Sequence, residues 1–117
     1  MINEYEFKKY LVNAIRIDNI NSAIELIKKH KYYNVALDTS IKENYIMLVK
    51  YLIINKYCSI DDAIIISLEN SQMEIFSYLK KFVTDLKPLL NAVILNNSAD
   101  SIIQIIGKIQ DPYNFFL

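Results

Sequence analysis

The sequence predicts an all-α protein that is a short solenoid of about four helix-turn-helix repeats. One segment of the chain recurs at a spacing of 27 residues (63 − 36). Within each copy the apolar residues follow the three- and four-residue intervals of amphipathic helices. The 53% hydrophobic content provides enough apolar surface to offset the entropy of ordering the chain. For 117 residues we expect a single domain over residues 1–117.

The repeat is clearest in the middle of the chain. Ala36–Leu52 aligns without a gap to Ala63–Leu79, with identical alanine, serine, tyrosine and leucine at four positions. Ala14–Ile27 fits less well at a spacing of 26 (40 − 14), and Leu95–Ile106 fits loosely at 27 (95 − 68). Weaker outer copies are expected, because a terminal repeat has only one neighbour. The predicted units are about 8–33, 34–60, 61–87 and 88–111, followed by a tail at 112–117.

The second unit shows how each copy makes two helices. We expect Asn34 to cap a helix from about Val35 to Glu43, and a turn at Asn44 to lead into a helix from about Tyr45 to Asn55. In the third unit the cap is Ser59 or Asp61, Asp62 lies in the first turn, and the helices break at Asn70–Ser71. A strand remains an alternative for Ile64–Ile66, because β-branched runs favour strands.

The fourth unit depends on proline and on polar turn residues. Pro88 suits a first helical position, and Asn97 or Ser98 begins the last helix. Gly107 is the only glycine in the chain, so helix breaks must be made by Asn, Asp and Ser, which tolerate turn geometry.

The helix pairs resemble the ankyrin repeat, in the loose form common in large DNA viruses. Ser40–Ile53 is similar to the family's paired helices, and Ser67–Leu79 repeats the pattern. The family's repeat is about 33 residues. The shorter units therefore imply that the β-hairpin fingers are shortened or absent, with residues 55–61 in place of one finger. The resemblance implies a protein-binding module, with partners meeting the concave face formed by the first helices.

Composition disfavours several other functions. The 13 basic and 13 acidic residues cancel, so neither nucleic acid nor an anionic membrane is an expected partner. His30 and Cys58 are the only residues of their kinds, which leaves too few ligands for a zinc site and makes a nucleophilic pair an improbable arrangement. With one glycine there is no phosphate-binding loop. We therefore expect no enzyme and no cofactor or metal.

The basic and aromatic run Lys28–Tyr33 has two interpretations. It is suited to gripping phosphates and stacking bases. The favoured alternative is structural: the cations lie at the carbonyl end of a helix, and a tyrosine packs into the next unit. Salt-dependent binding to a mixed oligonucleotide would support the first interpretation.

The repeat frame selects the residues that we expect to meet a partner. They are the first-helix residues Asn13, Arg16, Thr39, Lys42, Ile66, Glu69 and Asn96, and the loop tyrosines Tyr32, Tyr33 and Tyr57. Arg16, Lys42, Glu69 and Asn96 form a ladder in which position is constant and charge varies, as recognition requires. Tyrosine offers a large contact area at a low ordering cost. The alternative interpretation of these positions is ordinary solvated surface.

The expected partner is another protein, of a host cell if the chain is viral. Two alternatives remain: a compact helical inhibitor of the viral Bcl-2-like kind, which captures one helix in a groove, and a self-assembling homodimer. No export signal is visible, and the unpaired cysteine is typical of a reducing compartment. We expect the host cytoplasm, with the nucleus as the alternative.

Overall fold

A computed structural model of the protein describes residues 2–96, and this part of the chain is helical throughout. It contains seven α-helices, one 3₁₀ helix and no strand. The all-α prediction is therefore confirmed, and the strand alternative is wrong because Ile64–Ile66 lies inside a helix. The chain forms two compact units, residues 1–59 and 60–117, and each is described by itself.

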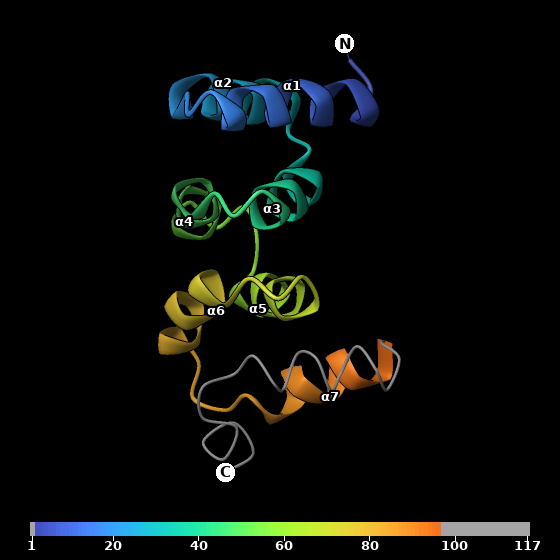
Figure 1. Ribbon diagram of the computed structural model, residues 1–117, viewed down its shortest axis with the longest axis vertical. Helices are drawn as coiled ribbons and strands as arrows, with labels where there is room; N and C mark the ends of the chain where they lie inside the picture. Colours follow the sequence, from blue (N-terminus) through green and yellow to red (C-terminus); the bar gives the residue numbers. More distant parts are fainter. Residues whose placement is uncertain (1, 97–117) are drawn as a thin grey trace. The chain divides into compact units, whose positions relative to one another are not determined.

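The first unit is two layers of paired helices (Figure 1). Its helices are α1 (Glu4–Arg16), α2 (Ile20–His30), α3 (Tyr33–Lys42) and α4 (Ile46–Ile54). Within each layer α1 contacts α2 and α3 contacts α4, while α1 on α3 and α2 on α4 join the two layers. The fully buried apolar side chains of this unit include Phe7, Leu11, Ala23, Ile27, Ala36, Ile41, Leu48, Val49 and Leu52.

The second unit repeats the first-helix and second-helix arrangement. It comprises α5 (Ile60–Glu69), α6 (Met73–Leu79), the 3₁₀ helix η1 (Lys80–Phe82) and α7 (Lys87–Asn96). Figure 1 shows α6 beside α5, and α5 also contacts α7. The buried apolar residues here are Ala63, Ile64, Leu68, Ile75, Phe76, Leu79, Leu89, Leu90 and Val93.

The first helices α1, α3 and α5 end in the same turn, which is made without glycine. In α3 the terminal turn places Asn44 at a left-handed φ of 55°. The N–H of Asn44 donates to the carbonyl of Ile41 at 2.9 Å, and the N–H of Tyr45 donates to the carbonyl of Ser40 at 2.8 Å. This pair of bonds satisfies two carbonyls that the helix end would otherwise leave unpaired.

The same turn recurs at the spacing that the sequence predicts. Asp18 (φ 55°) ends α1 and Ser71 (φ 56°) ends α5, with the same two backbone bonds. The three left-handed residues are 26 and 27 positions apart (44 − 18 and 71 − 44). The predicted turns at Asn44 and Asn70–Ser71 are therefore confirmed. The expectation that Asn, Asp and Ser replace glycine holds at the ends of these first helices, but the left-handed residues that follow α2 and α4 are lysines, Lys31 and Lys56.

A small residue precedes each of these turns and is fully or almost fully buried. Ala14, Ser40 and Ser67 occupy equivalent positions, and none is more than 5% exposed. The Ser40 hydroxyl donates to the carbonyl of Leu37 at 3.0 Å, and that of Ser67 to Ile64 at 2.8 Å. Each buried hydroxyl is thus satisfied within its own helix, and its small volume lets neighbouring helices approach.

Helix starts agree less well with the prediction. Asn34 does not cap α3: the helix begins at Tyr33, and Tyr32 at the cap position makes no side-chain hydrogen bond to it. The reason lies in Lys31, the residue before Tyr32. Its left-handed backbone (φ 61°) ends α2, and the chain then enters α3 after a single further residue. Pro88 is the second residue of α7 rather than the first.

The connections between helix pairs are short. Residues 31–32 join α2 to α3, and residues 55–59 follow α4. Neither segment contains a strand, so the prediction of shortened or absent fingers is confirmed for the part of the chain that the structure describes.

The fourth unit fits the repeat in a different register from the one predicted. At a spacing of 27, Leu95 would match Leu68, yet Leu95 is 84% exposed and Leu68 is 0% exposed. Leu90 and Val93, which are buried, match Ile64 and Ser67 at a spacing of 26. Periodicity alone did not resolve a one-residue slip in a degenerate repeat. The predicted last helix from Asn97 or Ser98 and the tail at 112–117 lie outside the described residues.

Two polar contacts tie the equivalent turns of the first unit together. Arg16 Nε lies 2.9 Å from Glu43 Oε1, and the Tyr45 hydroxyl donates to Asp18 Oδ1 at 2.7 Å. Burial, followed by the hydrogen bond and the charge of Asp18, raises the pKa of Tyr45 to about 12. The Arg16 side chain is 71% exposed, so its ion pair contributes little to stability.

The left-handed Lys31 allows a test of glycine-free helix termination. Replacing Lys31 with glycine should raise the free energy of unfolding by about 0.5–1 kcal/mol, because glycine adopts positive φ without a Cβ clash. The matched control is Lys28→Gly, three residues earlier within α2, which should lower it by about 1 kcal/mol. Urea unfolding followed by circular dichroism measures the free energy of unfolding of both variants. If the two substitutions changed it in the same direction, Lys31 would not be the left-handed residue that ends α2.

Tyr45 should make stability depend on pH in the alkaline range. The folded pKa of about 12 lies above the unfolded value of 10.0, so the contribution of the protonated hydroxyl is complete below pH 10 and is lost as the pH rises through 12. Tyr45→Phe should lower the free energy of unfolding by about 1 kcal/mol at pH 7. The difference from wild type should shrink above pH 10, and a pH-independent difference would contradict this account.

Candidate functional site

Three of the predicted ladder residues, Arg16, Lys42 and Glu69, occupy equivalent places at the ends of α1, α3 and α5. Arg16 and Lys42 are exposed in the last turns of α1 and α3 in the first unit, and exposed Glu69 ends α5 in the second. Lys42 Nζ lies 3.0 Å from Asp38 Oδ2, four residues earlier. Asn96 ends α7, but its side chain lies outside what the structure describes.

The second row of predicted first-helix residues does not form a uniform surface. Asn13 is exposed, Ile66 is half-buried, and Thr39 is only 2% exposed. Thr39 therefore does not reach the surface as predicted. It is buried because the α1–α2 pair covers α3 and α4 in the first unit. Its hydroxyl has no hydrogen-bond partner among the described residues.

The three predicted tyrosines come together at one end of the first unit. The rings of Tyr33 and Tyr57 stack 4.4 Å apart and almost parallel, and Tyr51 tilts against Tyr57 at 5.9 Å. Tyr32 packs on Phe7 at 5.2 Å, and its hydroxyl donates to the carbonyl of Ile2 at 2.9 Å. Tyr33 differs from the expectation in one respect, since it is the first residue of α3 and not part of a loop.

Burial and neighbouring hydroxyls set the chemistry of this cluster. Burial raises the pKa of Tyr51, and the nearby Tyr57 hydroxyl raises it further. The Cys58 thiol donates to the Tyr33 carbonyl at 3.4 Å, which fixes the segment after α4 against the start of α3. The cluster is therefore a fixed aromatic surface with polar hydroxyl groups.

A shallow groove connects the tyrosines to the first helices. A pocket of about 420 Å³ is lined by Glu4, Lys31, Tyr32, Tyr33, Asn34, Val35 and Tyr57. A second, of about 390 Å³, is lined by Glu4, Tyr5, Lys8, Asn34, Val35 and Asp38. Because they share Glu4, Asn34 and Val35, the two pockets adjoin, and we call their combined surface the first-helix groove.

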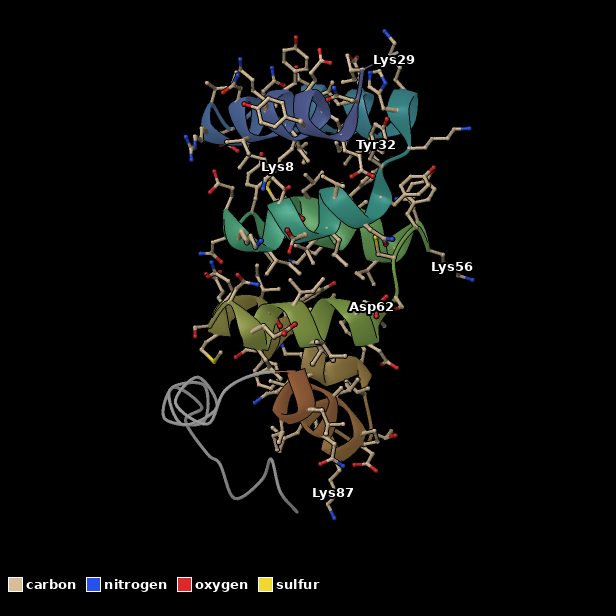
Figure 2. All side chains as sticks on the ribbon, turned by 90° about the vertical axis from the view of Figure 1, so that its right-hand side faces the viewer. Lys8, Lys29, Tyr32, Lys56, Asp62 and Lys87 are labelled. Carbon is tan, nitrogen blue, oxygen red and sulfur yellow. The ribbon has the colours of Figure 1, made fainter. Side chains whose placement is uncertain are left out.

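Figure 2 views the first unit from the side of this groove. Lys8 lies between α1 and α3 in that view, and Tyr32 lies where α2 gives way to α3. The groove has aromatic, aliphatic and charged walls, and acidic Glu4 and Asp38 lie among basic Lys8 and Lys31. Such mixed chemistry is suited to a peptide or protein surface.

Sequence reasoning missed Tyr5, Lys8 and Asp38. The sequence contained a pattern that could have pointed to two of them. Asp38 precedes the predicted Lys42 by one helical turn and so shares its helix face, and Lys8 matches Asn34 at the repeat spacing of 26. Tyr5 lies outside the aligned segments, and its place in the groove follows only from the packing of α1 on α3.

The remaining candidate residues have structural contacts. Lys28, Lys29 and His30 form the last turn of α2, as the structural interpretation of the basic cluster predicts. His30 packs edge-on against Phe7 at 6.2 Å. In the described part of the chain no three His, Cys, Asp or Glu residues are grouped to hold a metal ion. No helix within residues 2–96 is both long and apolar enough to span a membrane.

Comparison with known proteins supports the resemblance seen in the sequence. Over 71 residues, 61% of this chain, it is 34% identical to the "Putative ankyrin repeat protein L283" of Acanthamoeba polyphaga mimivirus. The match spans only 13% of that protein. No protein-family model matches the chain, and no solved structure matches it significantly. The paired helices, the recurring turns and this similarity together support the resemblance of the chain to the ankyrin repeat proteins of large DNA viruses.

Proposed function

We propose that the chain is a non-catalytic module that binds another protein through the first-helix groove. The observation that carries this proposal is the convergence of three separate tyrosines onto one groove between α1 and α3. Tyrosine is enriched among the residues that dominate binding energy at protein interfaces. The groove is built on two helices of one compact unit, so its walls are held before a partner arrives.

The charged residues beside the groove are suited to selecting among partners. Asp38 lines it and pairs with Lys42, while Arg16 pairs with Glu43 at the other end of the same helices. These exposed ion pairs contribute little to the stability of the fold, so charged groups of a partner can replace them with a small loss of free energy. Their contribution is to orientation and association rate.

The proposed partner is a protein of the host cell, met in its cytoplasm. Support comes from the similarity to an ankyrin repeat protein of an amoebal virus. A direct search is affinity purification of the tagged chain from amoebal lysate with mass spectrometry. Failure to recover a specific protein with the wild-type chain would count against this host.

Tyr57 is the best residue for testing the groove, because it is 36% exposed and lies at its aromatic end. Tyr57→Ala should weaken binding to the purified partner about tenfold or more, as expected for loss of a tyrosine anchor. Lys8→Glu should also weaken it by reversing charge in the groove. Isothermal titration calorimetry measures both.

The matched controls are Tyr10→Ala and Lys28→Glu, which change the same residue types on α1 and α2 outside the groove. They should bind the partner as wild type does. Circular dichroism checks that every variant retains its helices. Equal affinity of Tyr57→Ala, Lys8→Glu and wild type would rule out the groove as the binding surface.

A further inference from the structure

The second helices α2 and α4 are followed by turns that differ from those of the first helices. The left-handed residue after α2 is Lys31 and the one after α4 is Lys56, each with a φ of 61°. A tyrosine follows each lysine, and the two lysines are 25 positions apart (56 − 31). We call the segments Lys31–Tyr33 and Lys56–Cys58 the lysine turns.

Lysine is an unfavourable residue for this backbone geometry. A residue with a Cβ is strained at positive φ, and glycine or asparagine usually occupies such a position. The turns that end α1, α3 and α5 instead use Asp18, Asn44 and Ser71. A residue that disfavours the fold, and that nevertheless occupies both turns, indicates that its charge has a role beyond the fold.

The two lysine turns lie beside each other in the first unit. The ring of Tyr33 stacks on that of Tyr57 at 4.4 Å, and the Cys58 thiol donates to the Tyr33 carbonyl at 3.4 Å. In Figure 2, Tyr32 and Lys56 both lie toward the right-hand edge of the first unit. Both lysines are exposed, and neither makes an ion pair with another residue among 2–96. One edge of the unit therefore offers two ammonium groups to a ligand.

Other hydrogen-bond donors gather at the same edge. Burial raises the pKa of Tyr51, and the hydroxyls of Tyr57 and Tyr33 lie near enough to raise it further. The Tyr51 hydroxyl is buried and has no hydrogen-bond partner among the described residues. Residues 1–59 contain nine basic and six acidic residues, which gives a formal charge of +3 (9 − 6). Hydroxyl donors, ammonium groups and a positive surrounding charge together favour a ligand with negatively charged oxygen atoms.

We propose that the lysine turns bind an acidic segment of a partner protein, whose carboxylates accept hydrogen bonds from Lys31 and Lys56. This inference deepens the proposed function and rests on it, because Lys31 and Tyr57 also line the first-helix groove. One partner therefore reaches both surfaces. Glu4 lines the groove beside Lys31 and repels carboxylates there, so the acidic segment lies on the side of Lys56.

Nucleic acid fits the same edge less well. Bases stack on open aromatic faces, whereas Tyr33 and Tyr57 stack on each other and Tyr32 packs on Phe7. Two lysines also contact few phosphates, and the affinity of nucleic-acid binding depends on their number. An acidic protein segment needs only the two lysines, because its remaining contacts come from the groove.

The test is a titration of the isotope-labelled full chain with a polyglutamate peptide at low ionic strength, followed by NMR. The amide shifts should be largest at the lysine turns, and added salt should weaken binding. The double variant Lys31→Asn, Lys56→Asn should raise the dissociation constant about tenfold or more. Because asparagine tolerates positive φ, this variant should resist urea at least as well as wild type. Weaker binding then does not come from unfolding.

The matched control is the double variant Lys81→Asn, Lys87→Asn, which removes two exposed charges from the second unit. It should bind polyglutamate as wild type does. Tyr5→Ala should do so too, because Tyr5 lines the part of the groove that contains neither lysine. If polyglutamate binds at the lysine turns while Tyr57→Ala and Lys8→Glu keep full affinity for the purified partner, the groove fails and the lysine turns stand. Failure of this inference and failure of the proposed function are therefore separate results.

Several outcomes would overturn the proposal. They are the absence of polyglutamate binding, amide shifts that lie away from the lysine turns, and equal affinity of wild type and the Lys31→Asn, Lys56→Asn variant. Tighter binding of an oligothymidylate than of polyglutamate with the same charge would assign the edge to nucleic acid. Salt-sensitive self-association, seen by light scattering, would assign it to a second copy of the chain.

Discussion

The left-handed residue that ends each first helix is the constraint on which the rest of the fold depends. At Asp18, Asn44 and Ser71 the backbone reverses and returns two N–H bonds to the last carbonyls of the helix. One of these carbonyls belongs to the small buried residue, Ala14, Ser40 or Ser67. The position that completes the turn is therefore also the position that allows close helix packing. Asn and Asp tolerate this conformation better than most residues, although glycine would be favoured there.

Stacking of two such pairs in the first unit explains where the functional surface lies. When α1 packs on α3 and α2 on α4, the face containing Thr39 is buried and the first-helix groove remains outside. Short connections place Tyr32 and Tyr33 directly at the start of α3, where Tyr57 stacks on the latter. A long finger between the helix pairs would separate these rings. The aromatic end of the groove is thus a consequence of the shortened repeat.

The sequence by itself determined the helical class, the 26- and 27-residue spacing, the glycine-free turns and the short connections, because these depend on local periodicity and turn chemistry. It also placed Arg16, Lys42 and Glu69 at equivalent, exposed helix ends. Only the tertiary structure decided that Thr39 is buried, that Leu95 is exposed and that Tyr5 and Lys8 share a groove with Tyr57. The physical reason is that a repeat fixes which residues are equivalent, whereas burial depends on whether a neighbouring pair covers them.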